Sequence, residues 1–449
     1  MATSREMTEG RALPLIFNFT LPLLLGNLLQ QTYSLVDAAI VGRFLGINAL
    51  ASVGASTSVV FLILGFCNGC CGGFGIPVAQ KFGARDYVTM RRYVAVSLQL
   101  AAVMSVVIAV VTSIYCADIL HMMSTPENIF TGAYYYLLVT FIGVPFTFFY
   151  NLLSSIIRAL GDSKTPFWFL LLSTVLNILL DLFYILVLGW GVAGAAIATL
   201  ASRVFCAVVV LWQLRMDRQP IVVRNYRQIR PDGKMIRRVL ALGIPSGIEN
   251  SMFQLGKLAI QSSVSTLGTV AIAAQAMTNI LENLNGIAAI GVGIGLMTVV
   301  GQCLGAGRKD EAVYYIKKLS VLAEIIVVAS CLLVFALTIP VTKLGGMEPE
   351  SARMCFHMIS WITVVKPIVW TLAFIPAYGL RAAGDVKFSM ITSCCTMWAC
   401  RFCLCVFLIR VMGFGPMGVW IGMFADWTVR SIIFTWRFHS RKWLEHKVI

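Results

Sequence analysis

Six acidic residues lie inside long apolar stretches of the sequence, where an ionised carboxylate is unusual. They are Asp37, Asp181, Glu249, Glu282, Glu324 and Asp426. On membrane-insertion scales, a charged residue at the centre of an apolar helix costs about 2.5 to 3.5 kcal/mol. Each of these carboxylates therefore needs a basic partner, a bound cation or a proton.

Asp37 and Asp181 have the surroundings of a cation or proton site. Asp37 follows a polar stripe that winds along the same stretch, formed by Asn27, Gln30, Gln31 and Ser34. Asp181 follows Asn177 by four residues, which places both side chains on one face of a helix. Carboxylate and amide oxygens suit a hard cation, or protons where burial favours the neutral carboxyl. We therefore expect both faces to look into protein or water.

Two of the other acids are expected to have structural roles. Asp426 can reach Arg430 one helical turn later, and Glu324 lies two turns from Lys317 and Lys318. Pairing with these bases lowers the cost of placing the carboxylates in an apolar stretch.

A second polar set lies on the apolar stretches 239–266 and 269–304. It consists of Glu249, Asn250, Gln254, Lys257, Gln261, Asn279, Glu282, Asn283 and Asn285. Lys257 is a candidate to neutralise Glu282, which would lower the burial cost of both. A structural network is the favoured interpretation, and a substrate or coupling role for Glu249, Gln254, Lys257 and Glu282 is the alternative.

The elements that must position these residues are transmembrane helices. The chain is 59% apolar and 12% charged, whereas ordinary soluble domains are about 25% charged. Apolar stretches long enough to cross the roughly 30 Å hydrocarbon layer recur along the whole chain. We expect an all-α, polytopic membrane protein with about 12 transmembrane helices. The expected spans are 14–42, 47–80, 92–117, 129–157, 165–188, 191–214, 239–266, 269–304, 314–340, 351–381, 388–411 and 415–437.

The basic residues indicate orientation rather than nucleic-acid binding. The net charge is +15, but Lys and Arg are concentrated in alternate loops between the spans. The positive-inside rule then places both termini in the cytoplasm of a multi-pass protein of the cell (inner) membrane. No Walker loop, catalytic triad or metal-ligand cluster is evident in the sequence, so we do not expect an enzyme.

The two halves of the sequence repeat each other at an offset of about 223 residues. Pro22 corresponds to Pro245, and the segment Arg158–Lys164 corresponds to Arg381–Lys387. An even number of spans in each repeat makes the two copies parallel. We therefore expect two six-helix lobes, residues 1–214 and 239–449, joined by a basic cytoplasmic linker, residues 215–238.

Several motifs occur in an order that is typical of one transporter family. They are LVDAAIVGRFLGINALASVG in the first span, N-x-x-x-D in the fifth, GVAGAAIATLAS in the sixth, and the doubled R-x-x-GD-x-K element. Together they resemble the multidrug and toxic compound extrusion (MATE) family, over essentially the whole chain. The order, spacing and duplication carry the resemblance, because each motif alone is loose.

The resemblance implies a cation site in the N-terminal lobe. DinF-like prokaryotic members use an aspartate of the first span, an Asn and an Asp one turn apart in the fifth, and a threonine of the sixth. These roles fall on Asp37, Asn177, Asp181 and Thr199, which would form an all-oxygen pocket for Na⁺ or protons. The alternative is that the four side chains only join neighbouring helices through hydrogen bonds.

The sequence departs from another branch of the family in its C-terminal half. That branch places a glutamate in the seventh span and an aspartate in the tenth. Here the position nine residues after Pro245 is Gln254, and residues 371–373 contain no acid. The sequence does not support a C-lobe cation site of that type.

These observations predict an antiporter that exports small organic compounds, cationic or amphipathic, by alternating access in exchange for H⁺ or Na⁺. The alternative is a flippase for a lipid-linked sugar or other amphipathic lipid of the same wider superfamily, which the acid-bearing N-lobe disfavours. We expect a monomer whose partners are its substrate and membrane lipids, with no nucleic acid and no cofactor apart from the coupling ion.

Overall fold

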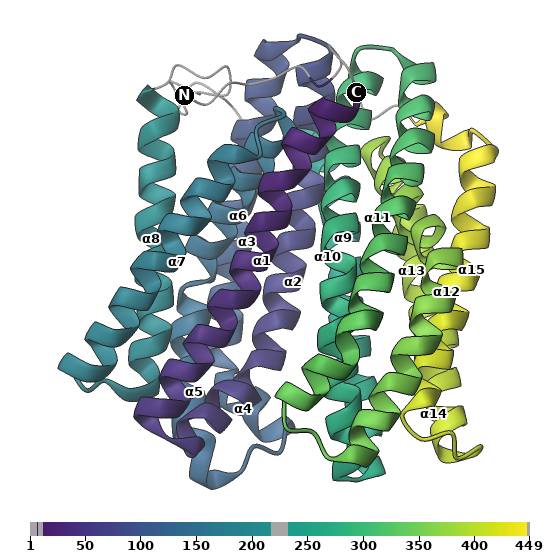
Figure 1. Cartoon of the computed structure of the whole chain (residues 1–449). Coiled ribbons are helices and arrows are strands. Elements are labelled where there is room, and N and C mark those ends of the chain that lie inside the picture. Colours follow the sequence, from purple (N-terminus) through teal and green to yellow (C-terminus); the bar gives the residue numbers. More distant parts are fainter. Residues whose placement is uncertain (1–6, 8–11, 217–231, 447–449) are drawn as a thin grey trace. The chain divides into compact units, whose positions relative to one another are not determined.

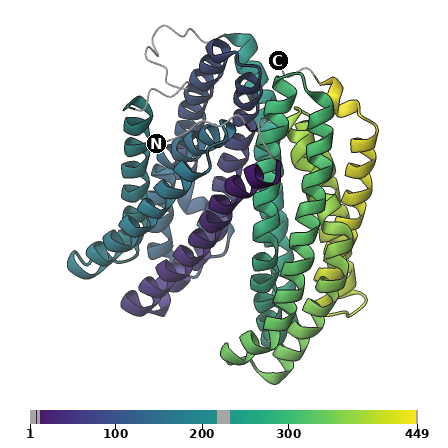
Figure 2. The same cartoon turned by 45° about the horizontal axis from the view of Figure 1, so that its top comes forward.

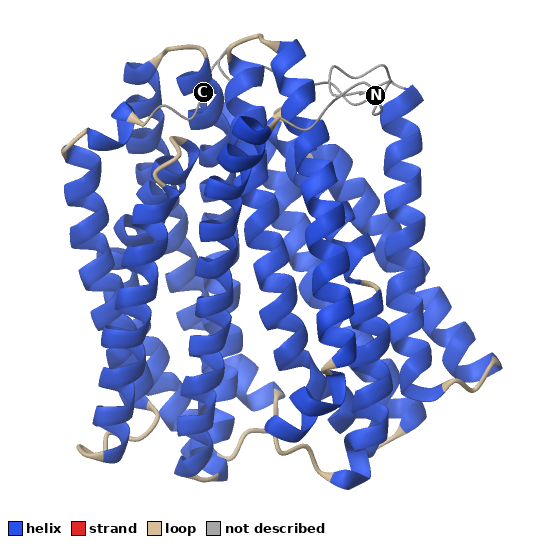
Figure 3. Cartoon of the chain, turned by 180° about the vertical axis from the view of Figure 1, so that it is seen from behind, coloured by secondary structure: helices blue, strands red, loops and turns tan. Residues whose placement is uncertain are grey.

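The structure is a computed structural model that describes residues 7, 12–216 and 232–446. Every regular element in these residues is a helix, as Figure 3 shows by its single helix colour. Hydrocarbon offers no partner to backbone N–H and C=O groups, so each spanning segment must satisfy its hydrogen bonds within itself. The described part of the chain confirms the predicted all-α fold.

The chain divides into two compact units, and most helices belong wholly to one of them. The first unit contains Leu21–Ser251 and the described Met7. Figure 1 shows its helices in purple to teal. They are α2 (Ile47–Gly83), α3 (Tyr87–Ile114), α4 (Cys116–Met122), α5 (Glu127–Ile142), α6 (Val144–Ala159), α7 (Lys164–Leu182) with the π-helix η1 (Phe183–Val187), and α8 (Gly191–Met216).

The second unit contains Met252–Ile449 and Thr8–Thr20, so far as these residues are described. Figure 2 shows its long helices, green to yellow, running side by side. They are α10 (Thr269–Gly305), α11 (Lys309–Leu344), α12 (Pro349–Ala382), α13 (Val386–Thr396) with the π-helix η4 (Met397–Cys403) and α14 (Leu404–Arg410), and α15 (Met417–His439). Two short 3-10 turns, η3 (Ser265–Leu267) and η5 (Lys442–Glu445), complete it.

Two helices contribute to both units. The boundary passes through α1 (Ala12–Leu45) at residue 20 and through α9 (Gly233–Val264) at residue 251. In the first unit, Gly69 and Gly73 of α2 face the backbone of α9 so closely that a Cβ atom at either position would clash with it. This close approach explains why the first half of α9 packs with α2.

The predicted linker, 215–238, lies largely outside the described residues, so the predicted lobe boundaries stay a prediction.

The internal repeat is visible in the backbone. Helices α2 and α10 each have 37 residues. Each begins after a glycine with positive φ, 88° at Gly46 and 92° at Gly268. Only glycine adopts such an angle without strain. The repeated GD elements show the same feature, with φ of 82° at Gly161 and 95° at Gly384.

Nine helices of the described chain are long and apolar enough to cross a membrane. The count becomes ten when α5 and α6, bent by 49°, form one broken span. Pro145 lies in the first turn of α6, where it cannot donate the backbone hydrogen bond that would continue α5. The predicted spans 239–266 and 415–437 lie on α9 and α15, which are less apolar and are not among these ten.

Polar helix ends are capped where the chain turns. Asp86 precedes α3 and accepts a hydrogen bond from the Thr89 backbone nitrogen at 3.2 Å. Hydrogen bonds from Thr89 hold the pKa of Asp86 below its usual range. Its carboxylate is therefore ionised at neutral pH and pairs with Lys81 at 3.3 Å.

Candidate functional site

Three helices of the first unit bring together the four predicted cation-site residues. Asp37 comes from α1, Asn177 and Asp181 come from α7, and Thr199 comes from α8. Asn177 and Asp181 are buried, at 2% and 0% exposure, while Asp37 and Thr199 are half-buried. The four-residue spacing on α7 places both of its polar side chains on the face that meets the other two helices.

Asn177 connects the α7 carboxylate to α8. With its amide nitrogen facing Asp181, Asn177 donates to Asp181 Oδ2 at 2.9 Å, and its oxygen accepts from the Thr199 backbone nitrogen at 3.0 Å. This amide orientation is the one that satisfies both ends of the side chain. Asn177 therefore orients Asp181 and also fixes the distance between α7 and α8.

The Asp37 and Asp181 carboxyl groups lie within hydrogen-bonding reach of each other. The Oδ1 atom of each is buried and has no partner among the described residues. Two carboxylates this close cannot both remain ionised without a positive charge between them. A shared proton or a bound cation supplies that charge, and the unfilled Oδ1 atoms together with the Asn177 and Thr199 oxygens suit a hard ion such as Na⁺.

Two tyrosines that the sequence analysis did not single out also belong to this site. The Tyr33 hydroxyl lies 3.2 Å from Thr199 Oγ1, and both Tyr33 and Tyr136 interact electrostatically with the two aspartates. The sequence held a signal for Tyr33, which precedes Asp37 by four residues. It held none for Tyr136, which the fold brings in from α5.

Apolar packing and a π-helix surround the acidic pair. Ile40, Val41, Val53 and Ile185 form a buried cluster, against which Val36, Ile178 and Tyr136 pack. Because this environment is poorly polarisable, charges inside it interact more strongly than in water. The π-helix η1 begins two residues after Asp181, and such segments often occur at functional sites.

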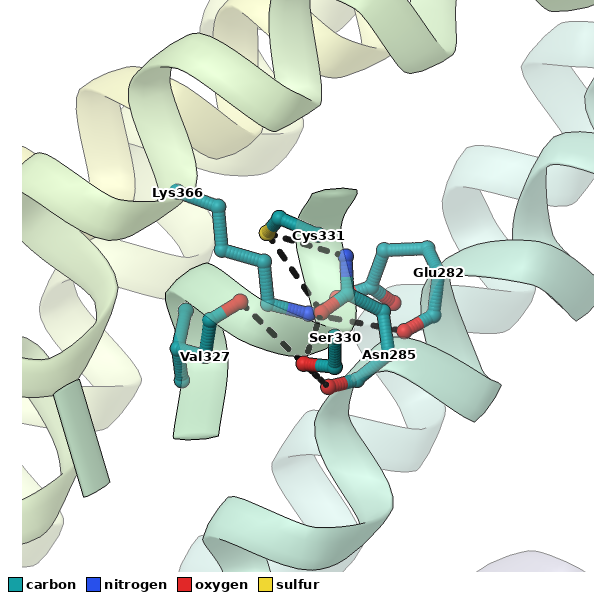
Figure 4. Close-up of polar contacts among 6 residues, drawn as sticks. All are labelled: Glu282, Asn285, Val327, Ser330, Cys331 and Lys366. Atoms are coloured by element: carbon teal, nitrogen blue, oxygen red, sulfur yellow. Dashed lines mark hydrogen bonds and ion pairs between the residues drawn. The ribbon is translucent and has the colours of Figure 1, made fainter. Parts of the chain in front are cut away.

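In the second unit, Lys366 neutralises Glu282. The Lys366 Nζ atom lies 2.7 Å from Glu282 Oε1, and the lysine side chain is fully buried. Figure 4 shows this pair beside Asn285, which hydrogen-bonds Ser330 and Cys331. The prediction that Lys257 would pair with Glu282 is therefore wrong. Sequence spacing could not show that α12 places a lysine beside α10.

Lys257 and Gln254 make no ion pair or hydrogen bond with Glu282 or Lys366 among the described residues, although Lys257 lies within electrostatic range of Glu282. Lys257 is exposed, and its ammonium lies 4.8 Å from the centre of the Phe253 ring. Gln254 follows Phe253 on α9 and is half-buried. Glu249 lies on the part of α9 that belongs to the first unit. The four residues therefore do not form one cluster within the second unit.

The predicted pairing of Asp426 with Arg430 is confirmed. The Arg430 Nε atom donates to Asp426 Oδ1 at 2.7 Å, and both side chains are buried. Arg430 also donates to Thr396 and Ser393 of α13. The sequence analysis missed a second buried arginine, Arg401, which lies in η4 and interacts electrostatically with Asp426 and Glu282.

A repeated bundle of membrane-spanning helices with a facing acidic pair in one repeat has the features of a membrane transporter. The MatE family profile matches residues 22–183 and again 245–407. The chain therefore belongs to the MatE family of multidrug efflux transporters, and the two matches coincide with the two repeats.

Individual relatives agree over nearly the full chain. The chain is 29% identical to "Probable multidrug resistance protein YoeA" of Bacillus subtilis (strain 168), over 100% of this chain and 99% of the relative. It is 25% identical to "Probable multidrug resistance protein NorM" of Thermotoga maritima, over 97% and 94% of the two chains. These relatives support the predicted multi-pass location in a cell membrane.

A solved structure has the same fold. It is described as "Outward-facing conformation of a multidrug resistance MATE family transporter of the MOP superfamily". The match has a TM-score of 0.84 at 23% identity and covers 95% of this chain and 96% of the other. At this identity the likeness establishes the fold, and it does not establish the roles of individual residues.

Proposed function

We propose that the protein is a cation-coupled antiporter that exports small organic compounds, cationic or amphipathic, in exchange for H⁺ or Na⁺. The observation that carries this proposal is the facing pair Asp37 and Asp181, which has no basic partner among the described residues. Both carboxyls lie on helices that reach across the first unit, so an ion bound between them joins α1 to α7.

Coupling follows from the change in charge when the site fills. When neither a cation nor a proton is bound, the two carboxylates repel each other. This repulsion favours an arrangement in which α1 and α7 separate or admit water. A bound cation favours the arrangement in which both carboxyls contact it. If the substrate prefers the other arrangement, the two ligands exchange by alternating access. Inward movement of one cation contributes about 2.3 kcal/mol per 100 mV of membrane potential.

Efflux from proteoliposomes tests the proposal. The native protein, Asp37→Asn and Asp181→Asn are reconstituted, ethidium is loaded, and an outward-to-inward gradient of H⁺ or of Na⁺ is imposed separately. We expect efflux to follow one gradient and both variants to lose it. The gradient that drives efflux then identifies the coupling ion.

A matched control separates the site from a general effect of acidic charge. Asp118→Asn removes an exposed carboxylate from the short helix α4 of the same unit and should leave efflux unchanged. Insertion is checked by size-exclusion chromatography of each variant. Normal gradient-driven efflux by both Asp37→Asn and Asp181→Asn would refute the coupling site.

We also propose that the protein acts as a monomer in contact with membrane lipids, with both termini in the cytoplasm. The support for this orientation is the basic composition of alternate loops, including Lys81 and Arg85 after α2 and Arg308 and Lys309 after α10. Single cysteines placed at these loops in a cysteine-free background should react with a membrane-impermeant maleimide only from the cytoplasmic side.

A further inference from the structure

Two basic side chains of the second unit, Lys257 and Arg401, have no acidic ion-pair partner among the described residues. Glu282 lies within electrostatic range of Lys366, Lys257 and Arg401. Arg401 in turn interacts with Asp426 and Arg430. Glu282 has its ion pair with Lys366, and Asp426 has its pair with Arg430. Lys257 and Arg401 therefore remain as two cations without an acidic ion-pair partner in the described residues, which is costly in an apolar helix bundle.

Arg401 is the more unusual of these two cations. Its side chain is only 6% exposed. The guanidinium Nε and Nη1 atoms have no hydrogen-bond partner within the described part of the chain. Most buried polar groups in proteins are hydrogen-bonded, and leaving a charged donor unsatisfied costs more than leaving a neutral one. Arg401 also lies in the π-helix η4, and π-helices are frequent at functional sites.

One aromatic ring, that of Phe253, contacts both cations. The Phe253 ring centre lies 5.2 Å from the Arg401 guanidinium carbon and 4.8 Å from Lys257 Nζ. Gly256, three residues after Phe253, packs against the Met397 side chain of η4. A ring face attracts a cation weakly, by about 0.5 to 2 kcal/mol. An anion with oxygen acceptors would interact with both cations more strongly.

The exposure of the three residues indicates how an anion could arrive. Lys257 is exposed, Phe253 is half-buried, and Arg401 is buried behind them. Of the two cations, the exposed Lys257 is therefore the one that an arriving anion meets first. The surrounding helices are apolar, so the ligand that fits combines an anionic oxygen group with an apolar body.

We propose that Lys257, Phe253 and Arg401 form a binding site for an amphipathic organic anion, with its carboxylate or phosphate on Arg401 and Lys257 and its apolar part beside Phe253. This site goes beyond the proposed function, because it lies in the second unit and takes the opposite charge from the coupling cation. The same chemistry is offered by a soluble aromatic carboxylate and by the headgroup of an anionic phospholipid.

Equilibrium binding to the purified full chain tests the site. The protein is placed in phosphatidylcholine nanodiscs and titrated with naphthalene-2-carboxylate, whose fluorescence reports binding. The variants are Arg401→Gln and Lys257→Gln. Arg410→Gln is the matched control, because it removes an exposed arginine from α14, nine residues further along the same helical segment.

We expect Arg401→Gln to weaken binding by about ten- to a hundredfold, the range for a lost hydrogen bond to a charged group. Lys257→Gln should weaken it less, and Arg410→Gln should leave it unchanged. The neutral naphthalene-2-carboxamide should not compete. Equal affinity of native protein and Arg401→Gln, or equal losses in Arg401→Gln and Arg410→Gln, would overturn the proposal.

Nanodiscs that contain an anionic lipid distinguish a phospholipid headgroup from a soluble anion as the ligand. Nanodiscs with phosphatidylglycerol should weaken apparent binding of naphthalene-2-carboxylate if the lipid headgroup occupies the site. Native mass spectrometry should then show phosphatidylglycerol retained by the native protein and lost from Arg401→Gln. No effect of phosphatidylglycerol indicates a soluble anion, and both results support the site.

Two further variants keep the test independent of folding and of the coupling site. If Arg401→Gln does not fold, the test uses Lys257→Gln, which changes an exposed residue. Unchanged affinity of Lys257→Gln for naphthalene-2-carboxylate then refutes the proposal. Asp37→Asn should bind naphthalene-2-carboxylate normally, because binding requires no ion gradient. A failure of cation coupling and a failure of the anion site are therefore distinguishable.

Discussion

The two repeats have similar backbones, but the charged residues without an ion-pair partner are acidic in the first and basic in the second. In the first unit, Asp37 and Asp181 face each other without a basic partner among the described residues. In the second unit, Glu282 pairs with Lys366 and Asp426 pairs with Arg430, which leaves Lys257 and Arg401 without an acidic ion-pair partner among the described residues. At the offset of about 223 residues, Asp181 corresponds to Leu404 and Arg401 corresponds to Ile178. Duplication has kept the helices and their glycine caps, while the chemistry of equivalent segments has diverged.

The largest effect that tests this comparison is expected at the acidic pair. Asp181→Asn replaces one of the two carboxyls by an uncharged group of the same shape. A bound cation then no longer favours one arrangement of α1 and α7 over the other. Coupled efflux should fall by about 5- to 150-fold, the range of a lost coupling free energy of 1 to 3 kcal/mol. Efflux of ethidium under the active gradient measures this. If Glu282→Gln lowers coupled efflux as much as Asp181→Asn does, the two units do not differ in coupling and the comparison fails.

The buried ion pair of the second unit should matter mainly for stability. Lys366→Met leaves the largely buried Glu282 without its ion-pair partner, which should cost about 3 to 5 kcal/mol. Thermal unfolding in detergent checks this, and the double variant Glu282→Gln with Lys366→Met should recover much of the loss. Arg308→Ala is the control, because it breaks an exposed pair with Glu311, 3.5 Å long, that should contribute about 1 kcal/mol or less. If the double variant is no more stable than Lys366→Met, the unpaired charge is not the cause.

Removal of the Tyr33 hydroxyl should have a smaller effect than removal of either carboxyl. Tyr33→Phe breaks the contact with Thr199 Oγ1, a hydrogen bond that contributes about 1 kcal/mol. Half-maximal activation of efflux by the coupling ion should therefore need about five times more ion. Titration of the efflux rate against ion concentration measures the shift. Unchanged activation would place Tyr33 outside the site.

The repeated aspartates of the GD elements should differ in their contributions to stability. Asp162 accepts hydrogen bonds from the Lys164 and Thr165 backbone nitrogens at 3.0 and 3.1 Å. Asp162→Ala should cost about 1 kcal/mol, as for a lost helix cap. Asp385→Ala should cost more, because Asp385 pairs with Arg437 at 2.7 Å and is 4% exposed. Thermal unfolding of the two variants measures the difference, and equal costs would contradict it.

The sequence by itself determined the helical membrane fold, the repeat and the two aspartates of the acidic pair. Long apolar stretches can cross a membrane only as helices, and Asn177 and Asp181 share a face because they are four residues apart. The repeat was readable because glycines with positive φ, such as Gly161 and Gly384, tolerate no other residue without strain. Tyr33 could have been added by the same spacing argument.

Only the tertiary structure decided which charges meet between helices. Lys366 and Arg401 lie on segments distant in sequence from Glu282, and no periodicity relates them. Asp162 and Asp385 occupy the same place in the repeat, yet one caps its own helix and the other joins α15 through Arg437. Spacing along a helix fixes which side chains share a face, whereas contacts between helices depend on how those helices pack.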